Sequence, residues 1–341
     1  MSQKIILGVD AGGTKTLCAA LCRESLEIHT AVGGPSNYQS VGIEAAVAVW
    51  SDVVRRALAP MGASLSGLAT AGLGIAGLDR PKDETTILAG WKRVVGDVPL
   101  ELVNDAYLAL RAGTRDGVGV AVVSGTGCNA MGTNAAGKRF RVGGVGPEFG
   151  DLGSASDIGV EAMKASFRSL DGRGPQTALV EMLCDRLALD RLDDIVDFFL
   201  ADNVDEDATE HHFGTGALAP LVFEAAGKSD EVSVKILQWA GRELGQSARA
   251  VARQLFATDE AFTLVMGGSV LQKAGTQHLK EALLQDVSTE FTGFVPVTLD
   301  LPPVAGALLY ALDLAAGRTS DAGQGELAQH YDTVRAMKTN G

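Results

Sequence analysis

The chain has 341 residues, of which 46% are hydrophobic and 42 are glycine, so it is long enough for about two domains and can bury sizeable cores. Its formal net charge of −13 leaves no basic stripe to meet the phosphates of a nucleic acid, and we interpret the acidic excess as a solubilising surface. A single nucleotide is not excluded, because backbone dipoles and Mg²⁺ can hold one polyanion.

Cysteine usage and hydropathy give further limits. None of the four cysteines lies in a Cys-x-x-Cys pair, and the five histidines complete no zinc pattern. Cys18 and Cys22 fall in a strand-like run, which favours small core residues. The sequence has no basic start followed by a long apolar segment and no run near 18 apolar residues, so we expect a cytoplasmic protein without membrane contact.

Residues 7–16, Leu-Gly-Val-Asp-Ala-Gly-Gly-Thr-Lys-Thr, join a predicted strand at Lys4–Val9 to another at Leu17–Leu21. Glycines let backbone N–H groups approach an anion, and the threonine hydroxyls add donors. Asp10, at the strand end, is placed to hold a hydrated Mg²⁺. By itself, the segment is equally compatible with an ordinary Gly-Gly hairpin.

The rest of the first half predicts an α/β order. After Asn104 or Asp105, either of which can cap a helix, a helix begins at Ala106. The other expected elements are a strand at Ile28–Val32, a helix at Val41–Leu58, a strand at Leu68–Ile75, a helix at Asp83–Val95 and a strand at Leu100–Val103.

The second half repeats the opening pattern of strand, Gly/Thr turn, strand and strand. Its predicted strands are Val118–Val123, a run ending at Gly132, and one around Arg139–Val142, with Ser124–Gly127 as the turn. Helices dominate from about 151 to 256, followed by a strand at Phe262–Met266 and a helix at Pro303–Ala315. We therefore expect domains at 1–116 and 117–321 around a central cleft, with a flexible tail at 322–341.

Six segments in this order resemble the actin/Hsp70/sugar-kinase superfamily over about residues 4–316, and within it the N-acetylglucosamine kinase-like branch of the BadF/BadG/BcrA/BcrD-type ATPase family. The motifs are Asp10–Thr16, Pro35–Asn37, Asn104–Ala106, Ser124–Asn129, Gly143–Ser154 and Met266–Ser269. The resemblance implies two actin-like, ribonuclease H-like α/β domains and phosphorylation of an amino sugar by ATP with Mg²⁺. N-acetylglucosamine is the expected sugar, its 6-phosphate the expected product, and a homodimer the family expectation.

The resemblance also assigns roles. Asp105 would be the general base that takes the proton of the attacking hydroxyl, although a helix N-cap needs the same residue there. Asp10 would hold Mg²⁺ through water. Nucleotide and phosphate contacts are expected from Asp10, Gly12, Gly13, Thr14, Lys15, Thr16, Gly125, Thr126, Gly127, Gly267, Gly268 and Ser269. Sugar contacts are expected from Asn37, Asn104, Asp105, Thr126, Asn129, Gly144 and Asp151, although Asp151 could instead cap the next helix.

Two departures from the family pattern affect the sugar pocket. Val145 stands where relatives often have Trp, and Leu152 where they often have Glu, which removes a flat wall and an acceptor. Glu148 or Asp157 facing a substrate amine would favour glucosamine instead, while a solvated helix face is the ordinary alternative.

Two functions of other classes fit the sequence less well. An activase-type ATPase for an iron–sulfur enzyme would need cysteine ligands, but Cys128 lies inside the expected substrate loop and Cys184 in no matching motif. A sugar-responsive DNA-binding regulator would need a helix-turn-helix, for which the expected first strand leaves no room, and a Cys-x-Cys-type zinc motif, which is missing.

Overall fold

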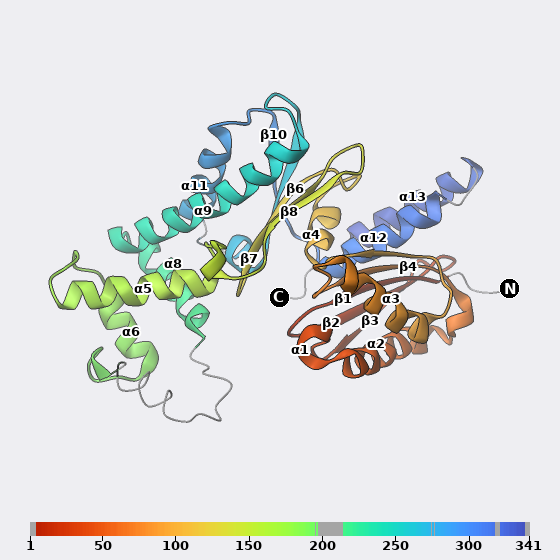
Figure 1. The fold of residues 1–341 in the computed structure, drawn as a ribbon, viewed down its shortest axis with the longest axis horizontal. Coiled ribbons are helices and arrows are strands. Elements are labelled where there is room, and N and C mark those ends of the chain that lie inside the picture. Colours follow the sequence, from red (N-terminus) through yellow and green to blue (C-terminus); the bar gives the residue numbers. More distant parts are fainter. Residues whose placement is uncertain are drawn as a thin grey trace. The chain divides into compact units, whose positions relative to one another are not determined.

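The computed structural model describes residues 5–194, 196, 214–273, 275, 277–317 and 321–337. The chain forms two compact units, Met1–Gly119 with Leu299–Gly341, and Val120–Thr298. Each unit has its own five-stranded sheet covered by helices, as Figure 1 shows. The α/β fold class predicted from the sequence is confirmed.

The first sheet has the strand order β3-β2-β1-β4-β5. Its strands are β1 (Ile5–Ala11), β2 (Thr16–Cys22), β3 (Ile28–Gly33), β4 (Leu68–Ile75) and β5 (Leu100–Val103). The first three strands pair antiparallel, whereas β4 and β5 run parallel to β1. The ends of β1, β4 and β5 that precede the motif loops therefore meet at one edge of the sheet.

Alternate residues of β1 face opposite layers. Ile5, Leu7 and Val9 join the core formed with α2 (Ile43–Leu58) and α3 (Pro81–Val95), which also buries the stacked pair Trp50 and Trp91. The short helices of this unit are α1 (Tyr38–Val41), η1 (Ala59–Met61), η2 (Leu65–Gly67) and α4 (Ala106–Gly113).

Helix α12 (Pro303–Ala316) packs on the opposite face of this sheet at backbone contact distance (Figure 1). A Cβ on Gly72 of β4 would lie 2.0 Å from the Ala307 carbonyl oxygen, and one on Gly8 of β1 would lie 2.7 Å from the Leu308 nitrogen. A Cβ on Gly306 itself would lie 2.1 Å from the Leu108 oxygen of α4. The missing side chains let helix, sheet and α4 approach this closely.

A partly buried ion pair joins α4 to α12. The guanidinium of Arg111, only 1% exposed, donates to both carboxylate oxygens of Asp313 at 2.7 and 2.8 Å. The hydroxyl of Tyr331 in α13 (Asp321–Arg335) donates to Asp313 at 2.9 Å. Helices α12 and α13 thus pack within the first unit, whereas we expected the second domain to extend to 321 and a tail to cover 322–341. The last residues of that expected tail, 338–341, lie outside the described residues. The glycine spacing, not local periodicity, decides where α12 docks.

The second sheet repeats the order of the first, as β10-β9-β6-β7-β8. Its strands are β6 (Gly119–Ser124), β7 (Cys128–Thr133), β8 (Arg139–Gly143), β9 (Phe262–Gly267) and β10 (Phe294–Thr298). β9 is parallel to both β6 and β10, while β7 and β8 are antiparallel. Each sheet therefore has the same arrangement around its first strand, as the repeated sequence pattern predicts.

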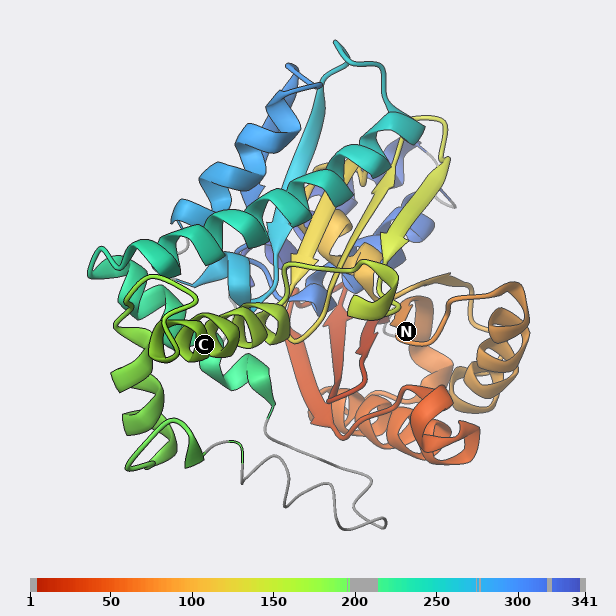
Figure 2. The same cartoon turned by 60° about the vertical axis from the view of Figure 1, so that its left-hand side comes forward.

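Helices of the second unit follow β8. They are η3 (Pro147–Phe149), α5 (Ala155–Leu170), α6 (Leu179–Leu187), η4 (Thr215–Leu218), α8 (Ala219–Gly227), α9 (Glu231–Leu255), α10 (Ser269–Gln272) and α11 (Gln277–Ser288). Figure 2 shows α9 crossing the face of the sheet with α11 beside it.

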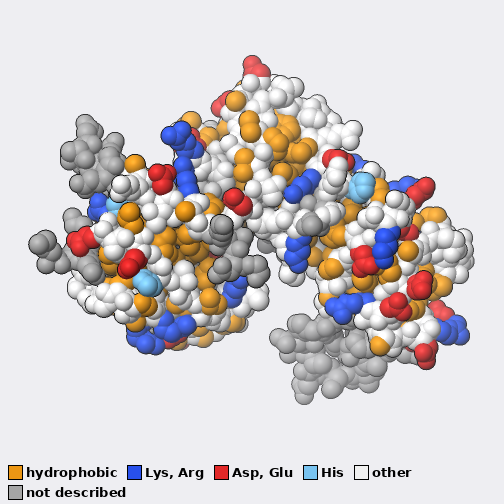
Figure 3. Space-filling model, turned by 180° about the vertical axis from the view of Figure 1, so that it is seen from behind, with side chains coloured by type: hydrophobic (Ala, Val, Ile, Leu, Met, Phe, Trp, Pro, Cys, Tyr) orange, Lys and Arg blue, Asp and Glu red, His pale blue; other side chains and the backbone are white. Residues whose placement is uncertain are grey.

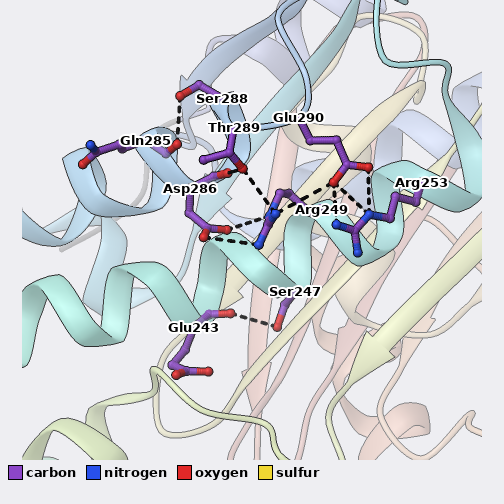
Figure 4. Close-up of polar contacts among 9 residues, drawn as sticks. All are labelled: Glu243, Ser247, Arg249, Arg253, Gln285, Asp286, Ser288, Thr289 and Glu290. Atoms are coloured by element: carbon purple, nitrogen blue, oxygen red, sulfur yellow. Dashed lines mark hydrogen bonds and ion pairs between the residues drawn. The ribbon is translucent and has the colours of Figure 1, made fainter.

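The α9–α11 pair is held by close packing and by ion pairs. A Cβ on Gly241 would lie 2.2 Å from the Leu279 oxygen, so the two backbones nearly touch. Arg249 donates to Asp286 at 2.8 Å, and Arg253 pairs with Glu290 just after α11 (Figure 4). These contacts hold α9 and α11 together as a pair that packs on the sheet.

Charged side chains of both signs are scattered over the face seen in Figure 3, in keeping with a solubilising surface. Among the described residues, no helix has the length and hydropathy needed to cross a membrane.

We predict that Gly72→Ala lowers the free energy of unfolding by about 2 kcal/mol or more, because the new methyl group would overlap the Ala307 carbonyl. Gly34→Ala, which places its methyl in open space, is the matched control and is expected to change little. Urea unfolding measures both. Equal stability of the two variants would show that α12 does not need this close approach.

Candidate functional site

The turn between β1 and β2 is tight and faces outward. The N–H of Gly12 donates to the Lys15 oxygen at 3.0 Å, while Gly13, Thr14 and Lys15 are exposed. Thr16 is buried at the start of β2, and its hydroxyl donates to the Gly34 oxygen at 2.8 Å. Exposed N–H groups on a rigid turn are suited to an anionic ligand.

Asp10 stands in β1 just before this turn, and Asp105 caps α4 just after β5. Burial, and then the negative charge of Asp105, raise the pKa of Asp10 from 3.8 to about 7, against the lowering effect of Lys15. Asp105 also accepts a hydrogen bond from the Ala106 N–H at 3.0 Å. The structure thus brings two carboxylates from different strands into mutual repulsion at one sheet edge.

The loop after β4 connects three further residues to that edge. The Asn104 amide donates to the Leu78 oxygen at 3.3 Å, and the Gln39 amide donates to the Gly77 oxygen at 2.9 Å. A Cβ on Gly77 would lie 2.5 Å from Asn37 Oδ1, so this loop lies directly against Asn37, the N-cap of α1. In the first unit, Asp10, Asn37, Asn104 and Asp105 therefore belong to one connected group.

In the second unit, the Ser124–Gly127 turn is fastened by α5. The Gly125 oxygen accepts from the Ala155 N–H at 2.8 Å, and the Thr126 oxygen accepts from the Ser156 hydroxyl at 2.9 Å. Because the carbonyls are engaged with α5, the turn is held rigidly, and Thr126 and Gly127 are left exposed.

The turn at Gly267–Ser269 lies against the Ser124–Gly127 turn. Gly268 has φ +87°, and a Cβ there would lie 2.2 Å from the Ser124 oxygen. Any side chain would therefore force the end of β9 away from the end of β6. The structure brings together the second and third predicted nucleotide motifs, which are about 140 residues apart in sequence.

A pocket of about 420 Å³ opens beside this turn. It is lined by Ala155, Gly216, Ala219, Pro220, Phe223, Glu224, Ser269, Val270, Lys273 and Gly275. Mostly apolar walls with a few polar groups are typical of sites for flat ring systems. The pocket lies wholly within the second unit.

Asn129, Gly144 and Asp151 form a third group. Asn129 Oδ1 is buried and has no hydrogen-bond partner within the described part of the chain, which leaves an acceptor ready for a donor from a ligand. A Cβ on Gly144 would lie 3.4 Å from Asn129 Nδ2. Asp151 accepts from the N–H groups of Val145 and Gly146 at 2.7 and 2.8 Å.

The contacts at the start of α5 show what Asp151 and Asp157 do there. The N-cap of α5 is Ser154, whose hydroxyl accepts a hydrogen bond from the Asp157 N–H. Asp151 therefore does not cap this helix. Asp157 in turn accepts from the Ser154 N–H at 2.9 Å and is buried as part of that capping box. Its carboxylate is thus engaged with the backbone, whereas Glu148 in η3 is exposed.

A sequence profile of the BadF/BadG/BcrA/BcrD ATPase family matches residues 7–311. The chain belongs to the BadF/BadG/BcrA/BcrD ATPase family. It is 30% identical over 323 residues to an N-acetyl-D-glucosamine kinase from Dictyostelium discoideum, covering 92% of this chain and 99% of that protein. It is 33% identical over 270 residues to an N-acetylmuramic acid/N-acetylglucosamine kinase from Clostridium acetobutylicum, covering 79% and 86%.

Among solved structures, a candidate N-acetylglucosamine kinase from Chromobacterium violaceum matches with a TM-score of 0.66 and 25% identity. The match covers 91% of this chain and all of that one. The likeness thus extends over both units of this BadF/BadG/BcrA/BcrD family member.

Sequence patterns missed one polar network in this family member. The Tyr38 hydroxyl donates to Asp83, which is fully buried and also bonded by the side chain and N–H of Arg80. Arg80 above all, together with Tyr38 and backbone N–H groups, holds the pKa of Asp83 well below its usual range. Because Tyr38 follows Asn37, this network fixes the segment that carries Asn37. The sequence placed Asp83 at the start of a predicted helix, but no local pattern indicated its pairing with Tyr38.

The pocket residues Phe223, Glu224 and Lys273 were also missed, since the first two lie in α8, which carries no motif, and Lys273 follows α10, beyond the Met266–Ser269 motif.

We predict that Asp10→Asn stabilises the Mg²⁺-free protein at pH 8. Since the pKa of Asp10 is raised on folding, the folded state holds the proton more tightly than the unfolded chain. The cost of ionising Asp10 is therefore absent below pH 3.8 and grows as the pH rises towards about 7. Removing the charge should raise Tm at pH 8 and by less at pH 5.

The matched control is Asp97→Asn, whose carboxylate is 94% exposed and should show no such pH dependence. A Tm difference for Asp10→Asn that does not grow with pH would contradict the carboxylate repulsion.

Proposed function

We propose that this chain is an ATP-dependent amino-sugar kinase. Its substrate is N-acetylglucosamine, and it transfers the phosphoryl group to the 6-hydroxyl. The observation that supports it best is the pair Asp10 and Asp105 at one sheet edge. Phosphoryl transfer to a sugar needs charge neutralisation at the phosphates and an acceptor for the hydroxyl proton. The pair offers one carboxylate for each task. The relatives named as N-acetylglucosamine kinases match 92% and 91% of this chain, which includes parts of both units.

A divalent cation fits the Asp10 end. Its carboxylate is disfavoured in the charged form by burial and by Asp105, so a nearby cation relieves a penalty already present in the fold. Oxygen donors of this kind suit Mg²⁺, which usually keeps several waters and binds through few carboxylates. When bound, Mg²⁺ would neutralise charge on the nucleotide phosphates. Asp10 would hold it, through water.

Asp105 is the proposed general base. Its place at the end of β5 and the start of α4 keeps its carboxylate in a fixed orientation, with the Ala106 N–H bonded to one oxygen. The Asp105 carboxylate takes the proton from the sugar hydroxyl while the hydroxyl oxygen attacks the γ-phosphorus of ATP. The O–P bond to ADP breaks as the new O–P bond forms.

The nucleotide would be held by backbone groups and a pocket. Gly13, Thr14 and Lys15 would offer N–H, hydroxyl and ammonium donors to phosphate oxygens. Gly12 and Thr16, whose N–H and hydroxyl donate to Lys15 and Gly34, would fix the shape of this turn. In the second unit, Thr126 and Gly127 would offer N–H and hydroxyl donors, and Gly125, whose N–H donates to the Gly127 oxygen, would hold the turn. Ser269 lines the pocket of about 420 Å³, directly after Gly267 and Gly268. The pocket wall at Ala219, Pro220 and Phe223 is suited to an adenine ring.

The sugar would be recognised by amides and carboxylates. Asn129 supports this most strongly, because its buried oxygen lacks a partner within the described chain and a sugar hydroxyl can donate to it. The other proposed contacts are Asn37, Asn104, Asp105, Thr126, Gly144 and Asp151.

The structure weakens the iron–sulfur alternative. The Cys128 thiol donates to the Leu152 oxygen at 3.3 Å, and burial raises its pKa to about 12. Cluster ligands must be thiolates, and this thiol is strongly held in its protonated form.

We predict that Asp105→Asn lowers kcat with N-acetylglucosamine by at least about 100-fold, since a general base contributes roughly that much. Mg-ATP should still raise Tm of the variant, because the phosphate-binding turns are intact. Coupled ADP release and thermal shift measure the two effects, with Asp97→Asn as control and NMR of the product to identify the phosphorylated hydroxyl. Wild-type turnover in Asp105→Asn would remove the proposed base.

We predict that Asn129→Ala raises KM for the sugar about tenfold, the equivalent of about 1.4 kcal/mol for one lost hydrogen bond. KM for ATP should stay within about twofold. Steady-state kinetics with each substrate varied in turn gives this split. If both constants rise together, Asn129 supports the loop and does not contact the sugar.

A further inference from the structure

A second pocket, of about 520 Å³, lies between α5 and α9 and is closed by the loop at 173–175. Figures 1 and 2 show these two helices neighbouring one another in the second unit. We call it the Trp239 pocket. None of its lining residues belongs to the proposed kinase site.

Helix α5 contributes a charged face to the Trp239 pocket. Glu161, Lys164, Ala165 and Arg168 line it, at the spacing of one helix face. Lys164 pairs with Glu161 at 2.8 Å, and both side chains are partly or largely exposed. The Arg168 guanidinium makes no ion pair with any residue the structure describes, which leaves its donors for a ligand.

Helix α9 contributes a mixed face with the same spacing. Val232, Ile236 and Trp239 form an apolar wall, and Lys235 stands at its edge. Lys235 is 4.0 Å from Glu231, a contact too long and exposed to hold it firmly.

Arg173 completes the cationic rim from the loop. Its side chain is 68% exposed and donates through Nε to Asp171 at 2.7 Å, so a phosphate bound here would displace that carboxylate or share the guanidinium with it. Four cationic side chains thus line one concavity of a chain whose net charge is −13. Three of them have a carboxylate partner, and Arg168 lies within the electrostatic reach of Asp171. A concave group of cations beside an indole is suited to an anion that also carries a flat or apolar ring.

We propose that the Trp239 pocket binds a small organic phosphate, with the phosphate on Arg168 and Arg173 and the attached ring against Trp239. Its volume falls within the range of small-molecule sites, which suits a sugar phosphate or a nucleoside monophosphate. The pocket also shares α5 with the Ser124–Gly127 turn, through the Ala155 and Ser156 contacts described above.

Tryptophan fluorescence tests the proposal without any turnover. The chain has three tryptophans, and Trp50 and Trp91 are fully buried in the first unit, so acrylamide quenching reports chiefly on Trp239. The probes are N-acetylglucosamine 6-phosphate, AMP, inorganic phosphate and unphosphorylated N-acetylglucosamine. The Asp105→Asn protein serves as a second background, so that failure of the kinase proposal leaves this result intact.

We expect one of the two organic phosphates to protect Trp239 saturably, with both inorganic phosphate and the plain sugar at least tenfold weaker. Arg168→Gln should weaken binding at least tenfold. Arg242→Gln, which removes the same charge from an exposed position on α9 outside the pocket, should not. No protection by either organic phosphate, equal binding of inorganic phosphate, or equal loss in both variants would overturn the proposal.

Discussion

The burial of the Asp10 carboxylate, next to the like charge of Asp105, is the constraint on which the proposed chemistry depends. The two carboxylates come from strands β1 and β5, separated in the sheet by β4, and the parallel register brings their ends to one edge. Burial of Asp10 beside a like charge costs stability in the ligand-free chain, and the rest of the first unit supplies the rigidity that keeps the pair in place. The glycine contacts of α12 beneath the same strands provide much of that rigidity, because they leave the sheet no room to shift.

The second unit has the same sheet order, and its turns depend on helix α5 for their hydrogen bonds. Its turns must present backbone N–H groups while satisfying their own carbonyls, and α5 does this for the Ser124–Gly127 turn. The close approach of Gly268 to Ser124 then sets the pocket next to the turn. Helix α5 thereby holds the Ser124–Gly127 turn at its N-terminal end and lines the Trp239 pocket further along.

Much of the fold was predictable from the sequence, and the exceptions have physical causes. The strand at Leu100–Val103 was predicted at its observed bounds, because an apolar run stands between a proline and a helix cap. Strand β10 was missed because Pro296 interrupts a short run, and an edge strand tolerates the missing N–H. The sequence indicated Asp10 and Asp105 as site residues from their motifs. Their electrostatic coupling depends on strand register across β4, which no local pattern reveals.

The most direct test of the account is ADP release by the wild-type protein with Mg-ATP and a panel of acceptors. The panel holds N-acetylglucosamine, glucosamine, N-acetylmannosamine, N-acetylmuramic acid, glucose and no sugar. The account predicts turnover that depends on an amino sugar and is highest with N-acetylglucosamine. Slow ATP hydrolysis that is the same with every sugar and with none would contradict it.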